Sequence, residues 1–194
     1  TMKLYDALEK KLTKKELSFM PRAFDIVGSI AIFNDFPKEL KKREKLIAQT
    51  LISLHQHIKT VAKKSGKYAG KYRTPKITII AGEKTKETIH KENSVSLKLN
   101  VETCYFSSRL ATERLRVAKQ VKKGENVLVM FSGVMPFGLV IVKNSKAKSI
   151  YGIELRDKTA QQTLFNKLSI AVADIILRCE RLGNSSLDTR LTNF

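Results

Sequence analysis

Apolar and polar positions alternate along the first 64 residues in ways that predict regular structure. Residues 3–12 place leucines four apart, which is the spacing of one face of a helix. Residues 24–33, FDIVGSIAIF, are apolar and rich in β-branched side chains, so they predict one buried strand. Residues 38–64 follow Pro37 and set an apolar stripe against a lysine-rich side, which predicts one long amphipathic helix.

Strand patterns follow this predicted helix. Residues 76–82, KITIIAG, predict a strand, and residues 84–93 and 95–102 alternate in a way that predicts a pair of strands. A loop with glycines and a proline, KSGKYAGKYRTP, precedes them. We interpret residues 1–100 as a small α+β domain.

The second half of the chain follows an α/β order. Residues 107–121 predict a helix with a serine cap, and residues 126–131, NVLVMF, form the continuous apolar run of a parallel strand covered on both faces. Residues 149–155 predict another strand, and residues 157–182 predict a long helix. Alternating helices and strands indicate a parallel sheet, so we interpret residues 101–194 as an α/β domain.

The net charge of the chain is the feature of its composition that says most about its partner. The 194 residues include 37 Lys and Arg against 18 Asp and Glu, a net charge of +19, which favours a polyanionic partner and indicates nucleic acid first. An anionic membrane surface and a merely lysine-rich proteome are alternatives. No apolar run could span a bilayer, and the charged first residues resemble no signal peptide. Cys104 and Cys179 match no metal spacing and indicate reduced thiols of a cytoplasmic protein.

Two strand ends form a candidate nucleotide site. The first strand runs into FSGVMPF at residues 131–137, and the second ends at Glu154. Ligands bind beyond the carboxyl ends of parallel strands, where a glycine turn permits close approach and a carboxylate can accept hydrogen bonds from ribose hydroxyls. The alternative is an ordinary strand that ends in a capping glutamate.

Other candidate residues lie on a helix and in the lysine-rich loop. Arg109 and Glu113 are four apart and share a helix face, although a solvated surface pair would look the same. The loop at residues 64–75 mixes tyrosines with basic residues, which suits stacking on an exposed base and pairing with phosphate. A plain solvated loop is the alternative. His90 has no partner at a metal-ligand spacing, so we expect no metal site.

Taken together, several segments resemble the archaeal and eukaryotic type of tRNA (guanine-37 N1)-methyltransferase. They are RAFDIVGSIAIF, HQHIKTVAKK, GKYR, TIHKEN, CYFSSRLATER, and VLVMFSGVMPF with YGIEL, in the family's order and spacing. The resemblance implies a small α+β N-terminal domain followed by a partial Rossmann-like class I methyltransferase domain. It also implies S-adenosylmethionine as cofactor and the anticodon region of tRNA as substrate.

The resemblance also implies roles for individual residues. The family's base-contacting arginine falls on Arg73, and its general base falls on Glu113. Its substrate-side turn covers Tyr105, Phe106, Ser107 and Arg109. For cofactor binding the implied residues are Tyr105, Arg109, Phe131, Gly133, Pro136, Phe137 and Glu154. In such a site a carboxylate can accept the guanine N1 proton and an arginine can stabilise charge on O6. The sulfonium cofactor brings its own leaving group, so the resemblance implies no metal.

Three departures from the family pattern qualify this expectation. Val129 replaces an acidic residue of the first Rossmann strand, and Met135 replaces the central glycine of the cofactor turn, where its side chain would compete with the cofactor. The family's Asn-(Leu/Pro)-Pro motif does not occur after residue 155. We therefore hypothesise a methyltransferase that is truncated or degenerate. The alternatives are a non-catalytic tRNA-binding remnant and a relative of the wybutosine-type aminocarboxypropyl transferases.

Overall fold

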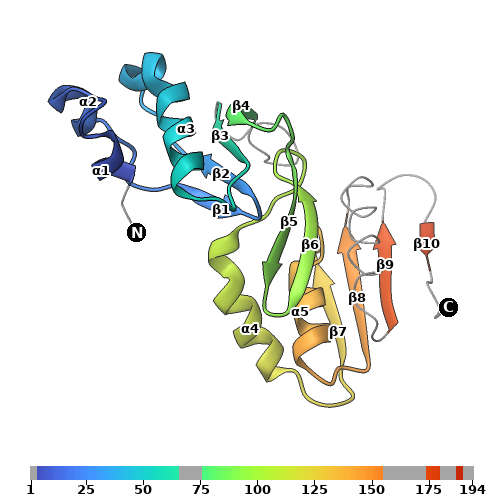
Figure 1. Cartoon of the computed structure of the whole chain (residues 1–194). Coiled ribbons are helices and arrows are strands. Elements are labelled where there is room, and N and C mark those ends of the chain that lie inside the picture. The colour runs from blue at the N-terminus through green and yellow to red at the C-terminus, as the bar shows by residue number, and fades with distance from the viewer. Residues whose placement is uncertain (1–3, 66–75, 155–173, 180–186, 190–194) are drawn as a thin grey trace. The chain divides into compact units, whose positions relative to one another are not determined.

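The computed structural model describes residues 4–65, 76–154, 174–179 and 187–189. Contacts divide the chain into two compact units, which we describe separately (Figure 1). Unit 1 is Thr1–Thr88 with Asn100–Glu102, and unit 2 is Ile89–Leu99 with Thr103–Phe194. The strand pair predicted at residues 84–102 therefore contributes mainly to unit 2.

Unit 1 contains a four-stranded mixed sheet in the order β1-β2-β3-β4. Its strands are β1 (Asp25–Val27), β2 (Ile30–Phe33), β3 (Thr60–Lys64) and β4 (Ile77–Gly82). The β1–β2 and β3–β4 pairs are antiparallel, whereas β2 and β3 run parallel. The parallel pair requires a crossover connection, which a helix provides.

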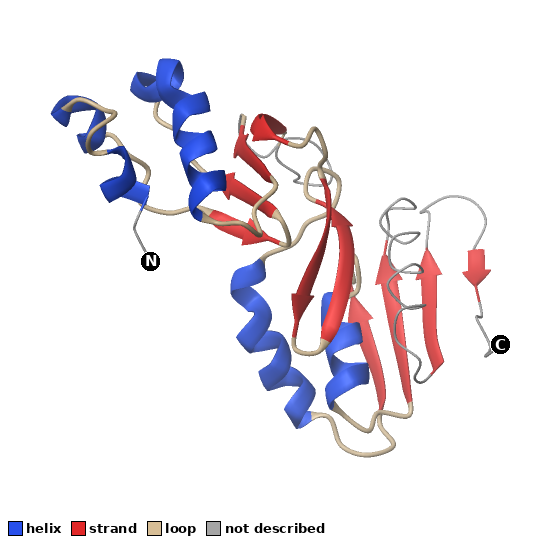
Figure 2. Cartoon of the chain, in the orientation of Figure 1, coloured by secondary structure: helices blue, strands red, loops and turns tan. Residues whose placement is uncertain are grey.

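Helices complete unit 1 and bury its core against the sheet. They are α1 (Leu4–Leu8), α2 (Lys14–Ser18), the 3-10 helix η1 (Lys38–Arg43) and α3 (Glu44–Leu54), which lies in the β2–β3 crossover (Figure 2). A capping box of Thr13 and Glu16 begins α2, and Glu16 also accepts a 2.8 Å hydrogen bond from Arg43. The fully buried core side chains include Leu8, Phe33, Ile47, Leu51 and Val61.

Unit 2 begins with most of a β-hairpin, which is formed by β5 (Glu87–Glu92) and β6 (Val95–Asn100). Its two turn residues, Asn93 and Ser94, both have positive φ, at 44° and 64°. This is the backbone of a two-residue type I′ turn, whose twist matches that of the strands it joins. The predicted pair of strands is confirmed.

The α/β part of unit 2 follows the hairpin. After the 3-10 helix η2 (Ser108–Leu110) come α4 (Ala111–Gln120), β7 (Asn126–Met130), α5 (Pro136–Asn144) and β8 (Ser149–Glu154), with β9 (Asp174–Cys179) and β10 (Leu187–Thr189) beyond. The sheet has the order β10-β9-β8-β7, in which β7, β8 and β9 are parallel and β10 is antiparallel. The predicted Rossmann-like α/β fold is confirmed.

The single helix predicted over residues 38–64 is wrong. The helix α3 ends at Leu54, and Thr60–Lys64 is strand β3, paired with β2 and β4. Ile58 and Val61 have the spacing of the helix's apolar stripe, but neither is part of the helix. Ile58 is buried in the connection after α3, and Val61 is buried in β3. Sheet pairing overrides a short helical pattern of this kind.

Two other predictions also fail. Residues 24–33 form two antiparallel strands, because Gly28 turns the chain with a φ of 55°. In the helix predicted over 157–182, residues 174–179 form β9 instead, in parallel register with β8. The sequence there is DIILRC, whose consecutive isoleucines suit a strand. The remainder of that predicted helix lies outside the described residues.

Strand β7 is less covered than its apolar sequence predicted. Leu128 and Met130 are 56% and 60% exposed, and both lie on the same face of the strand. Among the described strands, β7 forms one edge of the sheet. The prediction that both faces of this strand are buried is therefore wrong for the described part of the chain.

None of the helices in the described residues has the length and apolarity to cross a membrane.

Candidate functional site

The glycine turn after β7 has an open backbone. Phe131 has a φ of 54° and is 87% exposed, and Gly133 has a φ of 56°. Among the described residues other than its chain neighbours, a Cβ atom placed on Gly133 would come within 4 Å only of the carbonyl oxygen of Tyr105, at 3.8 Å. Next to it, the buried hydroxyl of Ser132 has no hydrogen-bond partner in the described structure. The turn therefore leaves both space and an unused polar group for a ligand.

The sequence position of Met135 predicted that its side chain would obstruct this turn, but the structure places that side chain elsewhere. Its backbone adopts the left-handed conformation, with a φ of 62°, and its side chain is fully buried. The side chain fills the notch left by Gly138 one turn later in α5: a Cβ on Gly138 would lie 2.4 Å from the Met135 Cε atom. The methionine is thus part of the packing of α5.

Glu154 lies at the carboxyl end of β8, opposite the glycine turn. One of its carboxylate oxygens accepts a 2.8 Å hydrogen bond from the Gly133 backbone N–H, and the Ser132 N–H donates to the carbonyl of Ile153. These bonds bring the predicted cofactor turn and the predicted ribose carboxylate together. Val129, which stands where the resemblance implies an acidic residue, pairs with Gly152 of β8.

The substrate-side turn also approaches the glycine turn. Tyr105 is exposed, and its carbonyl lies nearest to Gly133, as described above. The ring of Phe106 lies 5.0 Å from the guanidinium carbon of Arg114, and the ring of Phe137 lies 5.9 Å from it. The Arg114 guanidinium therefore lies near one aromatic ring of the substrate-side turn and one at the start of α5. Arg109, in η2, is exposed.

Glu113 lies in the first turn of α4 and is paired with a neighbour. Arg116 donates two hydrogen bonds to its carboxylate, of 2.6 and 2.7 Å, while the two side chains remain 44% (Glu113) and 57% (Arg116) exposed. The bonds from Arg116 hold the pKa of Glu113 below its ordinary value. Glu113 is therefore ionised at neutral pH and accessible, but engaged by Arg116.

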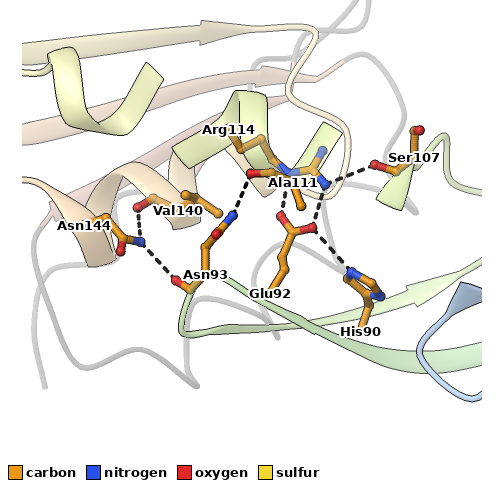
Figure 3. A network of polar contacts seen from close by, with 8 residues as sticks. All are labelled: His90, Glu92, Asn93, Ser107, Ala111, Arg114, Val140 and Asn144. Atoms are coloured by element: carbon orange, nitrogen blue, oxygen red, sulfur yellow. Dashed lines mark hydrogen bonds and ion pairs between the residues drawn. The ribbon is translucent and has the colours of Figure 1, made fainter. Parts of the chain in front are cut away.

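Arg114, the next residue of α4, lies in a buried network (Figure 3). It donates hydrogen bonds of 2.5 and 2.6 Å to Glu92 of β5 and one of 3.0 Å to the backbone carbonyl of Ser107. Nε2 of His90 lies 3.3 Å from the Glu92 carboxylate, and its ring packs on Phe106 at 5.0 Å. Burial alone would raise the pKa of Glu92, but hydrogen bonds from His90 and Arg114 outweigh it and lower that pKa.

The tip of the hairpin is fixed to both helices (Figure 3). The side-chain amide of Asn93 donates to the carbonyl of Ala111 at the start of α4, at 2.8 Å. The amide of Asn144 at the end of α5 donates to the Asn93 carbonyl at 3.0 Å and to the Val140 carbonyl at 2.9 Å. The hairpin thus braces the helices that flank the candidate site.

The structure brings together some of the residues singled out from the sequence. Gly133 is hydrogen-bonded to Glu154 and lies near the Tyr105 carbonyl, Phe131 belongs to the same turn as Gly133, and Phe137 lies at the start of α5. Pro136 is the first residue of α5, as expected of a residue that lacks a backbone N–H. Arg73 lies outside the described residues. No cluster of potential metal ligands occurs in the part of the chain that the structure describes.

Sequence reasoning did not identify Glu92 and Arg114 as a pair. They are 22 residues apart in the sequence, one on a strand and the other on a helix. The signal was present in part, because TIHKEN and ATER both belong to the segments that carry the resemblance. Only the tertiary structure shows that the two segments meet.

A mostly parallel sheet with a glycine turn and a carboxylate at adjacent strand ends is typical of Rossmann-like nucleotide-binding folds. Comparison with protein families is more specific. The TRM5/TYW2 methyltransferase domain matches residues 88–180, and the TYW2 N-terminal domain matches residues 4–85. The chain belongs to the TRM5/TYW2 methyltransferase family.

Individual relatives support this assignment. The chain is 45% identical over 137 residues to the tRNA (guanine(37)-N(1))-methyltransferase Trm5b of Pyrococcus abyssi, a match that covers 71% of this chain and 41% of the relative. It is 36% identical to the tRNA (guanine(37)-N(1))/4-demethylwyosine(37)-methyltransferase Taw22 of Nanoarchaeum equitans, over 80% of this chain and 51% of that protein. The chain thus spans about half the length of these relatives.

Solved structures agree with the fold. The crystal structure of Trm5b from Pyrococcus abyssi has a TM-score of 0.77 at 39% identity and covers 86% of this chain and 50% of its own. The complex of aTrm5 with tRNALeu has a TM-score of 0.76 at 28% identity, with coverages of 90% and 53%. TYW2 of P. horikoshii in complex with MeSAdo has a TM-score of 0.67 at 27% identity, with coverages of 86% and 58%.

Proposed function

We propose that this chain serves in the S-adenosylmethionine-dependent methylation of N1 of guanine 37, beside the anticodon of tRNA. The observation that carries the proposal is the open turn at Gly133, held by Glu154, in a chain 45% identical to a methyltransferase of that specificity. The net charge of +19 supports a tRNA substrate, because neutralising phosphates releases counterions and favours binding.

The residues around the turn fit the cofactor. Glu154 would accept hydrogen bonds from ribose hydroxyls, the Gly133 backbone would permit close approach, and the exposed ring of Phe131 offers a face for a planar group. The remaining sides of the proposed cofactor site would be formed by Tyr105, Arg109, Pro136 and Phe137. The cofactor supplies an electrophilic methyl group with its own leaving group. The full burial of Met135 against Gly138 supports a turn that remains open.

In this proposal the chemical task of the protein is to remove the proton from N1 of guanine. Guanine N1 carries a proton and is a poor nucleophile until that proton is removed. The Glu113 carboxylate would accept it, and Arg73 would stabilise negative charge that develops on O6 of the base. Glu113 first has to exchange its hydrogen bonds with Arg116 for the substrate, a step that its exposed position permits.

Two measurements test the proposal. Isothermal titration of the chain with S-adenosylmethionine should give saturable binding that Glu154→Gln weakens by about tenfold, as the loss of a charge-assisted hydrogen bond would. The matched control, Glu83→Gln, changes an exposed carboxylate of unit 1 and should leave binding unchanged. An unmodified tRNA transcript with G37 should then be methylated, and one with A37 should not. Absence of cofactor binding would refute the proposal.

A non-catalytic tRNA-binding role is the second candidate, and the charge of the chain favours it directly. A gel shift with the same transcript separates the two functions: retained tRNA binding without cofactor binding or product supports the second. The match of residues 4–85 to the TYW2 N-terminal domain favours a third candidate, the transfer of an aminocarboxypropyl group. Mass spectrometry of the product nucleoside distinguishes a methyl group from that larger group.

A further inference from the structure

Arg114 makes more connections than an ordinary buried ion pair requires. A guanidinium presents five N–H donors in a fixed planar fork, so one arginine can serve several acceptors at once. Here the fork serves both oxygens of Glu92 and the carbonyl of Ser107, while its plane lies near the rings of Phe106 and Phe137. Three elements of unit 2 therefore meet at one side chain: β5, the substrate-side turn and the start of α5.

The bond to Ser107 is the informative one. Ser107 directly precedes η2, and residues 105–107 belong to no helix or strand. Its carbonyl accepts from Arg114, whose position is in turn fixed by Glu92. Because the Arg114 and Glu92 side chains are only 2% and 4% exposed, water does not compete for these bonds.

We infer that Arg114 and Glu92 are positioning residues, which hold the Tyr105–Arg109 turn against the Gly133 turn and so set the geometry of the site proposed above. Glu92 anchors the guanidinium from the hairpin, and the guanidinium transmits that anchor to the Ser107 carbonyl. His90, which contacts both Glu92 and Phe106, closes the arrangement on the hairpin side. The effect on catalysis rests on the proposed function, whereas the positioning of the turn by Arg114 does not.

The geometry distinguishes positioning from simple stabilisation. A lysine at position 114 would keep the charge opposite Glu92, but a compact ammonium group cannot serve the carboxylate and the Ser107 carbonyl in the same fork geometry. Arg114→Lys therefore releases the turn and leaves the buried charges paired. Phe106→Leu is a second, milder variant, because it keeps the polar bonds of Arg114 and removes the ring that lies beside Arg114 and His90.

Hydrogen exchange on the intact chain provides the test. In Arg114→Lys, exchange of the backbone amides from Thr103 to Leu110 should rise by about tenfold, the change expected for one lost hydrogen bond to a charged group. Amides of β7 and α5 should exchange as in the wild type. Phe106→Leu should give a smaller rise in the same segment. The matched control is Arg43→Lys, which makes the same substitution in the Glu16 pair of unit 1 and should not change exchange in unit 2.

Methylation kinetics provide the functional half of the test. Arg114→Lys should lower kcat by about tenfold with little change in KM for tRNA, because the turn is misplaced while the binding surface is retained. An unchanged turn, or a uniform rise in exchange throughout unit 2, would overturn the inference. If the wild type binds no cofactor and makes no product, the proposed function fails, yet the exchange result still decides whether Arg114 positions the turn.

Discussion

The two sides of α4 use the same chemical pair in opposite ways. Glu113 and Arg116 form a bidentate carboxylate–guanidinium pair that remains about half exposed, whereas Glu92 and Arg114 form one of similar geometry that is almost fully buried. Within the residues that the structure describes, the side chains of the exposed pair make no further hydrogen bond, and water can replace either member. The buried pair has additional partners in His90, Ser107 and two aromatic rings.

This difference separates two functions that lie one residue apart in sequence. A base that must accept a proton has to change partners during the reaction, which an exposed pair can do at small cost. A residue that fixes a turn must not change partners, and a buried pair is costly to break. Successive residues of one helix point in different directions, so α4 can present both kinds of pair.

The largest expected effect is the loss of one partner of the buried pair. Glu92→Ala leaves Arg114 as an uncompensated buried charge and should lower the free energy of unfolding of unit 2 by about 3–5 kcal/mol. Urea denaturation followed by hydrogen exchange would measure the loss in unit 2. Glu113→Ala serves as the control on the exposed side and should leave the unfolding midpoint almost unchanged. Equal effects of the two substitutions would remove the contrast.

Glu113→Gln should separate catalysis from stability. The amide keeps the size of the side chain but cannot accept the N1 proton, so methylation under single-turnover conditions should fall by about a hundredfold or more. Thermal unfolding of unit 2 should match that of the wild type. A variant with full activity would show that another group removes the proton.

Arg116→Gln tests whether the exposed pair tunes the base. The hydrogen bonds from Arg116 lower the pKa of Glu113, so their loss should raise that pKa toward its ordinary value. Glu113 acts in its ionised form, and the acid limb of the pH–rate profile should therefore move to higher pH. The rate above that limb should change by only a few-fold. A profile that does not move would mean that Glu113 does not govern the acid limb.

The smallest effect concerns the exposed pair of Glu16 and Arg43 in unit 1. Hydrogen bonds from Arg43 and Thr13 lower the pKa of Glu16 from 4.5 to about 2. Its contribution to stability is complete above pH 4.5 and disappears as the pH falls toward 2. Denaturant titrations of the wild type and Glu16→Gln should therefore converge across this range. A stability difference that is constant with pH would contradict the assignment.

Local patterns predicted the parts of the fold that short segments determine. The apolar run before Gly133 and the one before Glu154 correctly located β7 and β8, because continuous apolar strands between polar turns have few alternatives. The turn at Gly133 and the carboxylate at Glu154 followed from those strand ends. The structure confirms that they meet, through the bond between them.

The parts that failed depend on contacts between distant segments. Thr60–Lys64 is a strand because β2 and β4 pair with it, and nothing within the segment itself outweighs the helical stripe before it. Residues 174–179 likewise become β9 through pairing with β8. The Glu92–Arg114 pair joins a strand to a helix across 22 residues, and no local pattern specifies which acidic residue will meet which arginine.

The notch at Gly138 has a consequence for the evolution of the chain. Met135 occupies a backbone conformation that costs a non-glycine residue about 1–2 kcal/mol, and it fits only because position 138 has no side chain. Exchange of the methionine for glycine would relieve the backbone but leave a hole in the packing of α5. Enlargement of position 138 would expel the methionine. The two sites should therefore covary among descendants of this gene, each mutation conditional on the other.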